Sequence, residues 1–147
     1  MFGQFAAIDI SASALSAERL RMEITANNIA NANTTKTEDG NPYRKQTVVF
    51  SNVMQNQAGS RPGKGVTSLS GVRVVGIEGD QSEFPVVFNP GHPHADENGF
   101  VRLSNVSVPN EMVDLITASR SYEANSKAIT LFKDMVEQTL SLLQGGR

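Results

Sequence analysis

The feature that most constrains the fold is a pair of long helical patterns, one at each end of the chain. In the first, apolar or small residues recur at steps of three and four from about Phe5 to about Ala30, which is the spacing of one helix face. The second starts near Pro109, a residue type typical of a helix start, and stops at Gly145–Gly146. The sequence therefore predicts two long terminal helices.

Between the helical patterns, short β-branched stretches are bounded by Gly, Pro, Asn and Asp, which predicts strands joined by turns. The predicted strand regions are Tyr43–Val53, Gly71–Asp80, Phe84–Asn89 and Gly99–Val106. The segment Gln55–Gly71 is rich in Gly and Ser and is predicted to be a mobile loop.

The predicted fold class is α+β, divided into two domains. We expect residues 1–34 and 108–147 to form a coiled-coil-like helical assembly domain, and residues 35–107 to form a small β-rich middle domain. A middle of this size has too little core to cover both apolar stripes, and a lone helix is only marginally stable in water. The stripes must therefore pack against each other or against other subunits, and their heptad-like spacing favours other subunits.

A cluster of asparagines ends the first helical pattern and has two possible roles. The amides can satisfy the last carbonyl groups of the helix. They can also form hydrogen bonds across a tightly packed subunit boundary, where polar side chains fix the register. Together with the apolar stripes, these asparagines give the candidate assembly residues. They are Phe5, Ile8, Leu15, Met22, Asn27, Asn28, Ile29, Asn31, Asn33, Met112, Leu115, Tyr122, Ile129, Phe132, Val136 and Leu140.

Composition excludes several function classes. The chain of 147 residues has a net charge of −2, so nothing in the total indicates a nucleic-acid or anionic-membrane partner. Cysteine is absent, which excludes a disulfide framework, thiol catalysis and a zinc–thiolate site. No apolar run reaches the length of a membrane span. The N-terminal stretch lacks the basic and apolar regions of a cleavable secretory signal, so we expect none.

The one enzyme-like string is HPHADE, in which His92, His94, Asp96 and Glu97 could supply metal ligands. The chain has no other His, and a single Pro-containing loop would have to supply every ligand. A loop with solvated histidines is the favoured interpretation, and a small metal-binding enzyme or ligand-binding module is the alternative. The string GSRPGK at Gly59–Lys64 departs from a phosphate-binding loop and precedes no helix. We therefore expect no cofactor, no metal and no catalytic residue.

Several blocks of the sequence resemble the flagellar axial proteins, which are the rod, hook and hook-associated proteins. ANNIANANT at Ala26–Thr34 resembles the signature at the end of their N-terminal helix, and Glu111–Ile129 resembles their C-terminal helix. Within the family, Gly40–Phe50 and Asn89–Val113 resemble the proximal-rod members. The resemblance covers nearly the whole chain, and His94 departs from it where an apolar residue is expected.

The resemblance implies a structural part and not an enzyme. Members of this family cross the inner membrane uncleaved through the flagellar type III export apparatus and assemble into a tubular axle in the periplasm, which carries torque from motor to hook. Their terminal helices form its inner layer. The implied partners are copies of the chain itself, other proximal and distal rod proteins, the adaptor at the rod base and the export apparatus.

Overall fold

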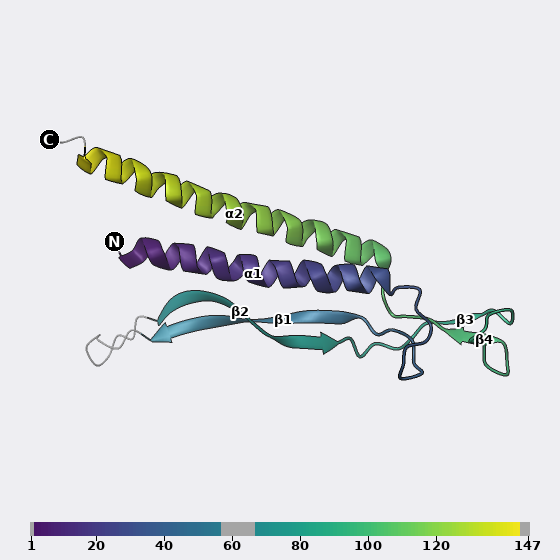
Figure 1. The fold of residues 1–147 in the computed structure, drawn as a ribbon. Coiled ribbons are helices and arrows are strands. Elements are labelled where there is room, and N and C mark those ends of the chain that lie inside the picture. The colour runs from purple at the N-terminus through teal and green to yellow at the C-terminus, as the bar shows by residue number, and fades with distance from the viewer. Residues whose placement is uncertain (1, 57–66, 145–147) are drawn as a thin grey trace. The chain divides into compact units, whose positions relative to one another are not determined.

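The computed structural model describes residues 2–56 and 67–144, with side chains described over 7–53 and 71–142 (Figure 1). The elements follow the order helix, four strands, helix. They are α1 (Phe2–Ala30), β1 (Gln46–Asn56), β2 (Thr67–Gly79), β3 (Val86–Phe88), β4 (Phe100–Arg102) and α2 (Val108–Gln144). The α+β prediction is confirmed, and both terminal helices lie within a few residues of their predicted bounds.

The strands form two separate two-stranded sheets. β1 pairs with β2, and their arrows run in opposite directions in Figure 1. β3 pairs antiparallel with β4, with Val87 opposite Val101 at the centre. The third predicted strand is shorter than expected because Pro85 and Pro90 flank it, and proline cannot donate to a strand ladder.

The predicted loop Gln55–Gly71 is wrong at both ends. β1 continues to Asn56 and β2 begins at Thr67, because a paired strand offers backbone hydrogen bonds that outweigh the weak strand preference of Asn in β1 and of Ser and Gly in β2. The rest of the predicted loop, residues 57–66, lies outside the described residues.

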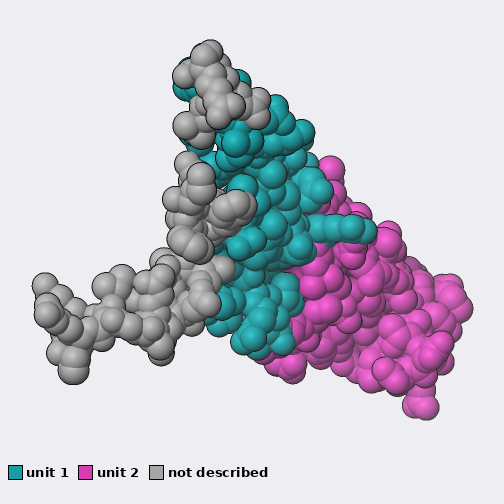
Figure 2. Space-filling model, turned by 60° about the vertical axis from the view of Figure 1, so that its left-hand side comes forward, with its two compact units in different colours: residues 1–19, 50–75, 118–147 teal, residues 20–49, 76–117 magenta. Residues whose placement is uncertain are grey.

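The chain divides into two compact units (Figure 2). The first contains residues 1–19, 50–75 and 118–147, and the second contains residues 20–49 and 76–117. Each unit combines helix and strand residues, and α1, α2 and the two long strands contribute to both. The division into a helical assembly domain and a β-rich middle domain stays a prediction.

The first unit packs through small residues. Its buried described positions are Ser11, Ala17, Gly71 and Ala118. Ser13 Oγ on α1 accepts a hydrogen bond from the backbone N–H of Val72 at 3.1 Å, so the backbone of β2 lies directly on the helix.

Gly71 makes this close approach possible. Its φ is +117°, in the region that favours glycine, and a Cβ built there would lie 2.4 Å from Ser13 Oγ. A side chain at this position would push β2 away from α1 and strain the backbone.

Replacing Gly71 with alanine is therefore expected to destabilise the first unit. Strain at a positive φ together with the clash predicts a loss of about 1–3 kcal/mol. Urea denaturation followed by circular dichroism measures the loss. Gly76→Ala is the matched control on the same strand, because a Cβ there meets nothing within 4 Å. Equal midpoints for the two variants would contradict the proposed close packing.

Candidate functional site

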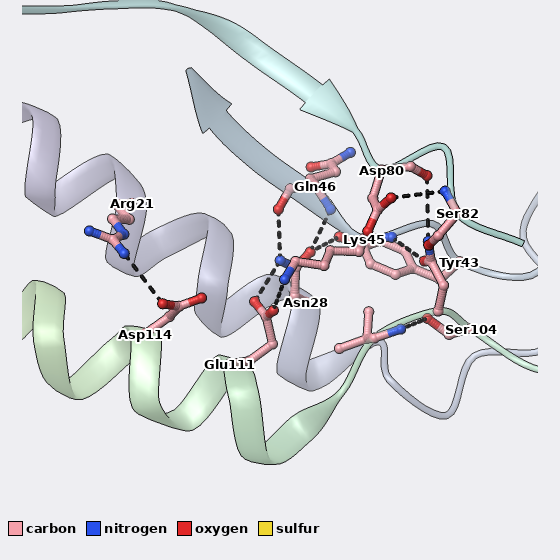
Figure 3. A network of polar contacts seen from close by, with 12 residues as sticks. Arg21, Asn28, Tyr43, Lys45, Gln46, Asp80, Ser82, Ser104, Glu111 and Asp114 are labelled. Atoms are coloured by element: carbon pink, nitrogen blue, oxygen red, sulfur yellow. Dashed lines mark hydrogen bonds and ion pairs between the residues drawn. The ribbon is translucent and has the colours of Figure 1, made fainter. Parts of the chain in front are cut away.

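A cluster of polar side chains lies in the second unit, where the end of α1, the chain entering β1 and the first turn of α2 come together (Figure 3). We call it the polar cluster, and its members are Asn28, Tyr43, Lys45, Gln46 and Glu111. Two of these residues, Asn28 and Glu111, are each only 1% exposed.

Asn28 is the centre of the polar cluster, and its side-chain amide makes four hydrogen bonds. Its Nδ2 donates to the Gln46 carbonyl and to Glu111 Oε2, each at 2.8 Å. Its Oδ1 accepts from the Gln46 N–H and from the Tyr43 hydroxyl, each at 3.0 Å. One asparagine thus pairs with both backbone groups of a residue at the start of β1, as a neighbouring strand would. Its hydrogen-bonding capacity is fully used within the chain.

Glu111 brings a carboxylate into the same buried space. Its Oε1 lies 2.6 Å from Lys45 Nζ, while its Oε2 accepts from Asn28. The residue lies in the first turn of α2, where the helix dipole favours a negative charge. A buried charge is tolerated when it is paired and hydrogen-bonded, and removing its partner is strongly destabilising. The polar cluster therefore ties α1, β1 and α2 together.

The surroundings of Tyr43 in the polar cluster shift the pKa of its phenol. Burial raises the pKa of its phenol, and the negative charge of Glu111 raises that pKa further. The hydroxyl consequently stays protonated and keeps donating to Asn28.

A second set of polar contacts links the chain just before β1 to the chain just after β2. Asp80 N–H donates to the Lys45 carbonyl at 2.8 Å, and Asn105 Oδ1 accepts from the Lys45 N–H at 2.8 Å. The hydrogen bond from the Ser82 N–H to the Asp80 carboxylate is the main cause that lowers the pKa of Asp80. These bonds hold the ends of β1 and β2 beside the segment that leads into α2.

An ion pair also joins α1 to α2, about one helical turn after Glu111 on α2. Arg21 Nη2 lies 3.3 Å from Asp114 Oδ1, and both side chains are partly exposed. A pair in such a setting contributes about 0–1 kcal/mol, so it orients the helices more than it stabilises them.

The arrangement holds elements of the second unit together. In the ranges 2–56 and 67–144, no group of three or more His, Asp and Glu residues is placed to hold a metal ion. His94 Nδ1 bonds with the Thr35 hydroxyl at 2.7 Å, and His92 Nδ1 accepts from the His94 N–H at 3.1 Å. Asp96 Oδ1 accepts from two backbone N–H groups of its own turn. Nothing in this loop favours the metal-binding alternative.

The asparagines predicted at the helix end fall into different roles. Asn31 Nδ2 donates to the Asn27 carbonyl at 3.0 Å, which confirms the predicted capping role for Asn31. Asn33 is exposed. Asn28 is buried and fully bonded within the chain, so it is an internal residue here, and the interface proposed below leaves it out.

The predicted apolar assembly residues lie at the surface or partly buried. Met112, Tyr122, Val136 and Leu140 are exposed, whereas Ile8, Leu15, Met22, Ile29, Leu115, Ile129 and Phe132 are half-buried. The side chain of Phe5 lies outside those described. Their role in assembly stays a prediction.

Sequence reasoning missed two groups of residues. Tyr43, Lys45 and Glu111 were not identified as members of a site, although Asn28 and Glu111 each lie within one of the family-like blocks. Further apolar side chains of α2 are exposed that are not among the candidate assembly residues named from the sequence. They are Val113, Ile116, Leu131, Met135 and Leu142.

No helix among the described residues combines the length and apolar character that a bilayer span needs.

The polar cluster yields a stability prediction. Asn28→Ala leaves Glu111 Oε2 and the Tyr43 hydroxyl without their partner, which is expected to lower the free energy of unfolding by about 2–4 kcal/mol. Chemical denaturation measures the change. Asn33→Ala, at an exposed position in the same cluster of asparagines, should change stability by less than about 0.5 kcal/mol. If both variants unfold at the same denaturant concentration, the polar cluster does not hold the unit together.

Comparison with known proteins gives a consistent result at both ends of the chain. Residues 8–36 match the family described as flagella basal body rod protein, and residues 97–142 match the C-terminal family of flagellar basal body rod FlgEFG proteins. The matched segments include Asn28 and Glu111.

Full-length relatives show the same similarity. The chain is 40% identical to the flagellar basal-body rod protein FlgC of Borreliella burgdorferi, over 97% of this chain and 99% of that protein. It is 43% identical to FlgC of Yersinia enterocolitica, over 92% of this chain and 95% of the relative. The chain is 36% identical to FlgC of Bacillus subtilis, over 94% of this chain and 97% of the relative.

Proposed function

Because this chain belongs to the FlgC family of flagellar basal-body rod proteins, we propose that it assembles by packing the exposed apolar side chains of α2 against neighbouring subunits. Family membership makes it a structural component of the basal-body rod and not an enzyme. The proposal concerns which surface makes the contacts, and which part of the fold presents it.

The apolar surface of α2 is the observation that carries the proposal. Large apolar side chains remain exposed along most of its length. They are Met112, Val113, Ile116, Tyr122, Leu131, Met135, Val136, Leu140 and Leu142. Several recur four residues apart, such as Leu131 and Met135 or Val136 and Leu140, so each pair lies on one stretch of the helix surface and the two pairs lie on different sides of the helix. Extended apolar surface of this kind marks an interaction site.

The energetic gain from covering this surface is large. Fully burying one side chain of the size of Leu or Met is worth about 1.5–3 kcal/mol. The seam that we propose combines these residues with the half-buried apolar positions of α1 in a coiled-coil-like packing. Small residues at Ser119 and Ser126 allow a neighbouring helix to come close.

The polar cluster supports this arrangement from within the second unit. Glu111 lies one residue before Met112, and its bonds to Asn28 and Lys45 fix the first turn of α2 against α1 and β1. Within the second unit, these bonds hold the first turns of α2, which carry Met112, Val113 and Ile116, in a defined register. The buried polar contacts thus specify geometry, and the exposed apolar residues supply the association energy.

We further propose the route and the location that the resemblance implies. The chain leaves the cytoplasm through the flagellar type III export apparatus without cleavage and works in the periplasmic rod, where it transmits torque toward the hook. Its partners there are itself, other proximal and distal rod proteins and the adaptor at the rod base. The absence of cysteine and the predominance of small buried side chains in the first unit support export, because they leave no cross-link and little core to unfold.

The seam predicts a specific loss of assembly. Leu140 is 50% exposed in the single chain, so Leu140→Asp is expected to leave folding and accumulation unchanged while it abolishes swimming. A charge buried in an apolar interface costs several kcal/mol unless it finds a partner. Gln138→Asp, which adds the same charge to an exposed polar position of α2, should swim normally. Motility in soft agar and monomer circular dichroism test this, and normal swimming of Leu140→Asp would remove the seam from the mechanism.

The export route predicts an unprocessed N-terminus. Protein recovered from isolated rods should begin at Met1 or lack only that residue, which intact-mass analysis determines. Deleting about the first ten residues should block delivery to the rod while the protein accumulates soluble in the cytoplasm. A mature N-terminus beyond about residue 15 would mean that a signal is removed, and the proposed route would be wrong.

A further inference from the structure

We propose that a hollow on the second unit, formed around Phe84 by Arg44 and Arg102, receives the Glu97 carboxylate of a second copy of this chain. This inference rests on the proposed function, because it requires neighbouring copies in the rod. It assigns a polar contact in the strand region, separate from the apolar seam of α2.

The hollow is large enough for a side chain and part of its loop. Its volume is about 530 Å³, and its lining includes Tyr43, Arg44, Phe84 and Arg102. The guanidinium carbon of Arg44 lies 4.3 Å from the centre of the Phe84 ring, and that of Arg102 lies 5.1 Å from it. Two cationic groups therefore share one aromatic ring at the wall of an open hollow.

The two arginines differ in how their donors are used. Arg44 Nη1 donates to the backbone carbonyls of Asp80 and Ser82, so Arg44 is held from behind by the chain. Arg102 is exposed, and its side chain makes no hydrogen bond or ion pair within the described part of the chain. A guanidinium presents a planar fork of donors that matches a carboxylate. One acidic residue, Asp39, also lines the hollow, and none of its described contacts is with either arginine.

Glu97 has the properties of the complementary group. It is exposed in the loop that joins β3 to β4, and it makes no hydrogen bond or ion pair with any described residue. Its loop is held by bonds from the Asn98 and Phe100 N–H groups to Asp96 Oδ1 and from the Gly99 N–H to the Asp96 carbonyl. A carboxylate on a preorganised loop binds at a low cost in conformational entropy.

The choice of Glu97 over nearby acids follows from position. Glu83 adjoins Phe84 in the chain and Glu38 adjoins Asp39, so both belong to the receiving side. Glu97 does not line its own hollow. A carboxylate that enters the hollow of the next copy, and not that of its own chain, makes a heterologous contact. Such contacts build rings or open helical arrays and not closed pairs, as an axial structure requires.

Docking in this hollow would also bear on the polar cluster. Tyr43 and Gln46 line the hollow, and both are hydrogen-bonded to Asn28. A neighbour that occupies the hollow would therefore contact the residues 43–46, which are bonded to Asn28 of α1 and, through Lys45, to Glu111 of α2.

Charge exchange between the two positions tests the proposal in flagellated cells. Arg102→Glu and Glu97→Arg are made singly and together in the chromosomal copy, and incorporation is measured as the amount of this chain in isolated rods. Each single variant should lower incorporation about tenfold or more, because like charges facing each other across an interface are strongly unfavourable. The double variant should restore it.

Two outcomes would overturn the proposal, and each is compared with a control variant. Arg73→Glu is the matched control, because Arg73 is an exposed arginine of β2 in the first unit. If Arg102→Glu behaves like Arg73→Glu while Leu140→Asp still blocks rods, the hollow is overturned and the proposed function stands. If Arg102→Glu blocks incorporation and Glu97→Arg fails to restore it, the second copy is overturned as the occupant.

Cross-linking gives a reading that does not depend on folding defects of charge variants. The natural chain has no cysteine, so Arg102→Cys and Glu97→Cys each introduce a unique thiol. In basal bodies that contain both variants, a short bismaleimide should yield a covalent dimer that is lost when either variant is present alone. Absence of the dimer from mixed basal bodies would overturn the contact.

Discussion

The buried carboxylate of Glu111 is the constraint on which the second unit depends. A charge this deeply buried persists only if its partners stay in place, and here the partners are Asn28 from α1 and Lys45 from the chain entering β1. Asn28 in turn bonds both backbone groups of Gln46. Three elements far apart in sequence are therefore held by one connected set of bonds, and loosening any one of them leaves buried polar groups unsatisfied.

The inside and the outside of the molecule have opposite character. Most buried positions in the described part of the chain carry polar or small side chains, as Asn28 and Ala118 illustrate, and Val48 and Val101 are the larger apolar exceptions. The surface of α2, in contrast, carries large apolar side chains such as Leu131 and Leu142, which are 66% and 79% exposed. A single chain with this distribution gains most when a neighbour covers the helix. This is the physical reason for treating assembly, and not chemistry, as the activity of the fold.

Sequence patterns predicted the elements better than their contacts. The three-and-four spacing located both helices, because that period depends only on local geometry. The extent of β1 and β2 was missed, since Ser and Gly near Thr67 are weak strand formers that pairing overrides. The polar cluster could not be derived, because the partners of Asn28 lie 18 and 83 positions away and a single sequence carries no record of such pairing. The asparagine motif nevertheless pointed to the right place.

The central claim is that neighbouring subunits cover the exposed apolar side chains of α2 in the rod. The most direct test is the rate at which a maleimide labels Leu131→Cys, because this is the only thiol in an otherwise cysteine-free chain. The account predicts fast labelling of the purified monomer and strong protection in isolated basal bodies. Equal labelling rates in the two states would show that position 131 of α2 remains accessible to solvent in the rod, and the account would be wrong.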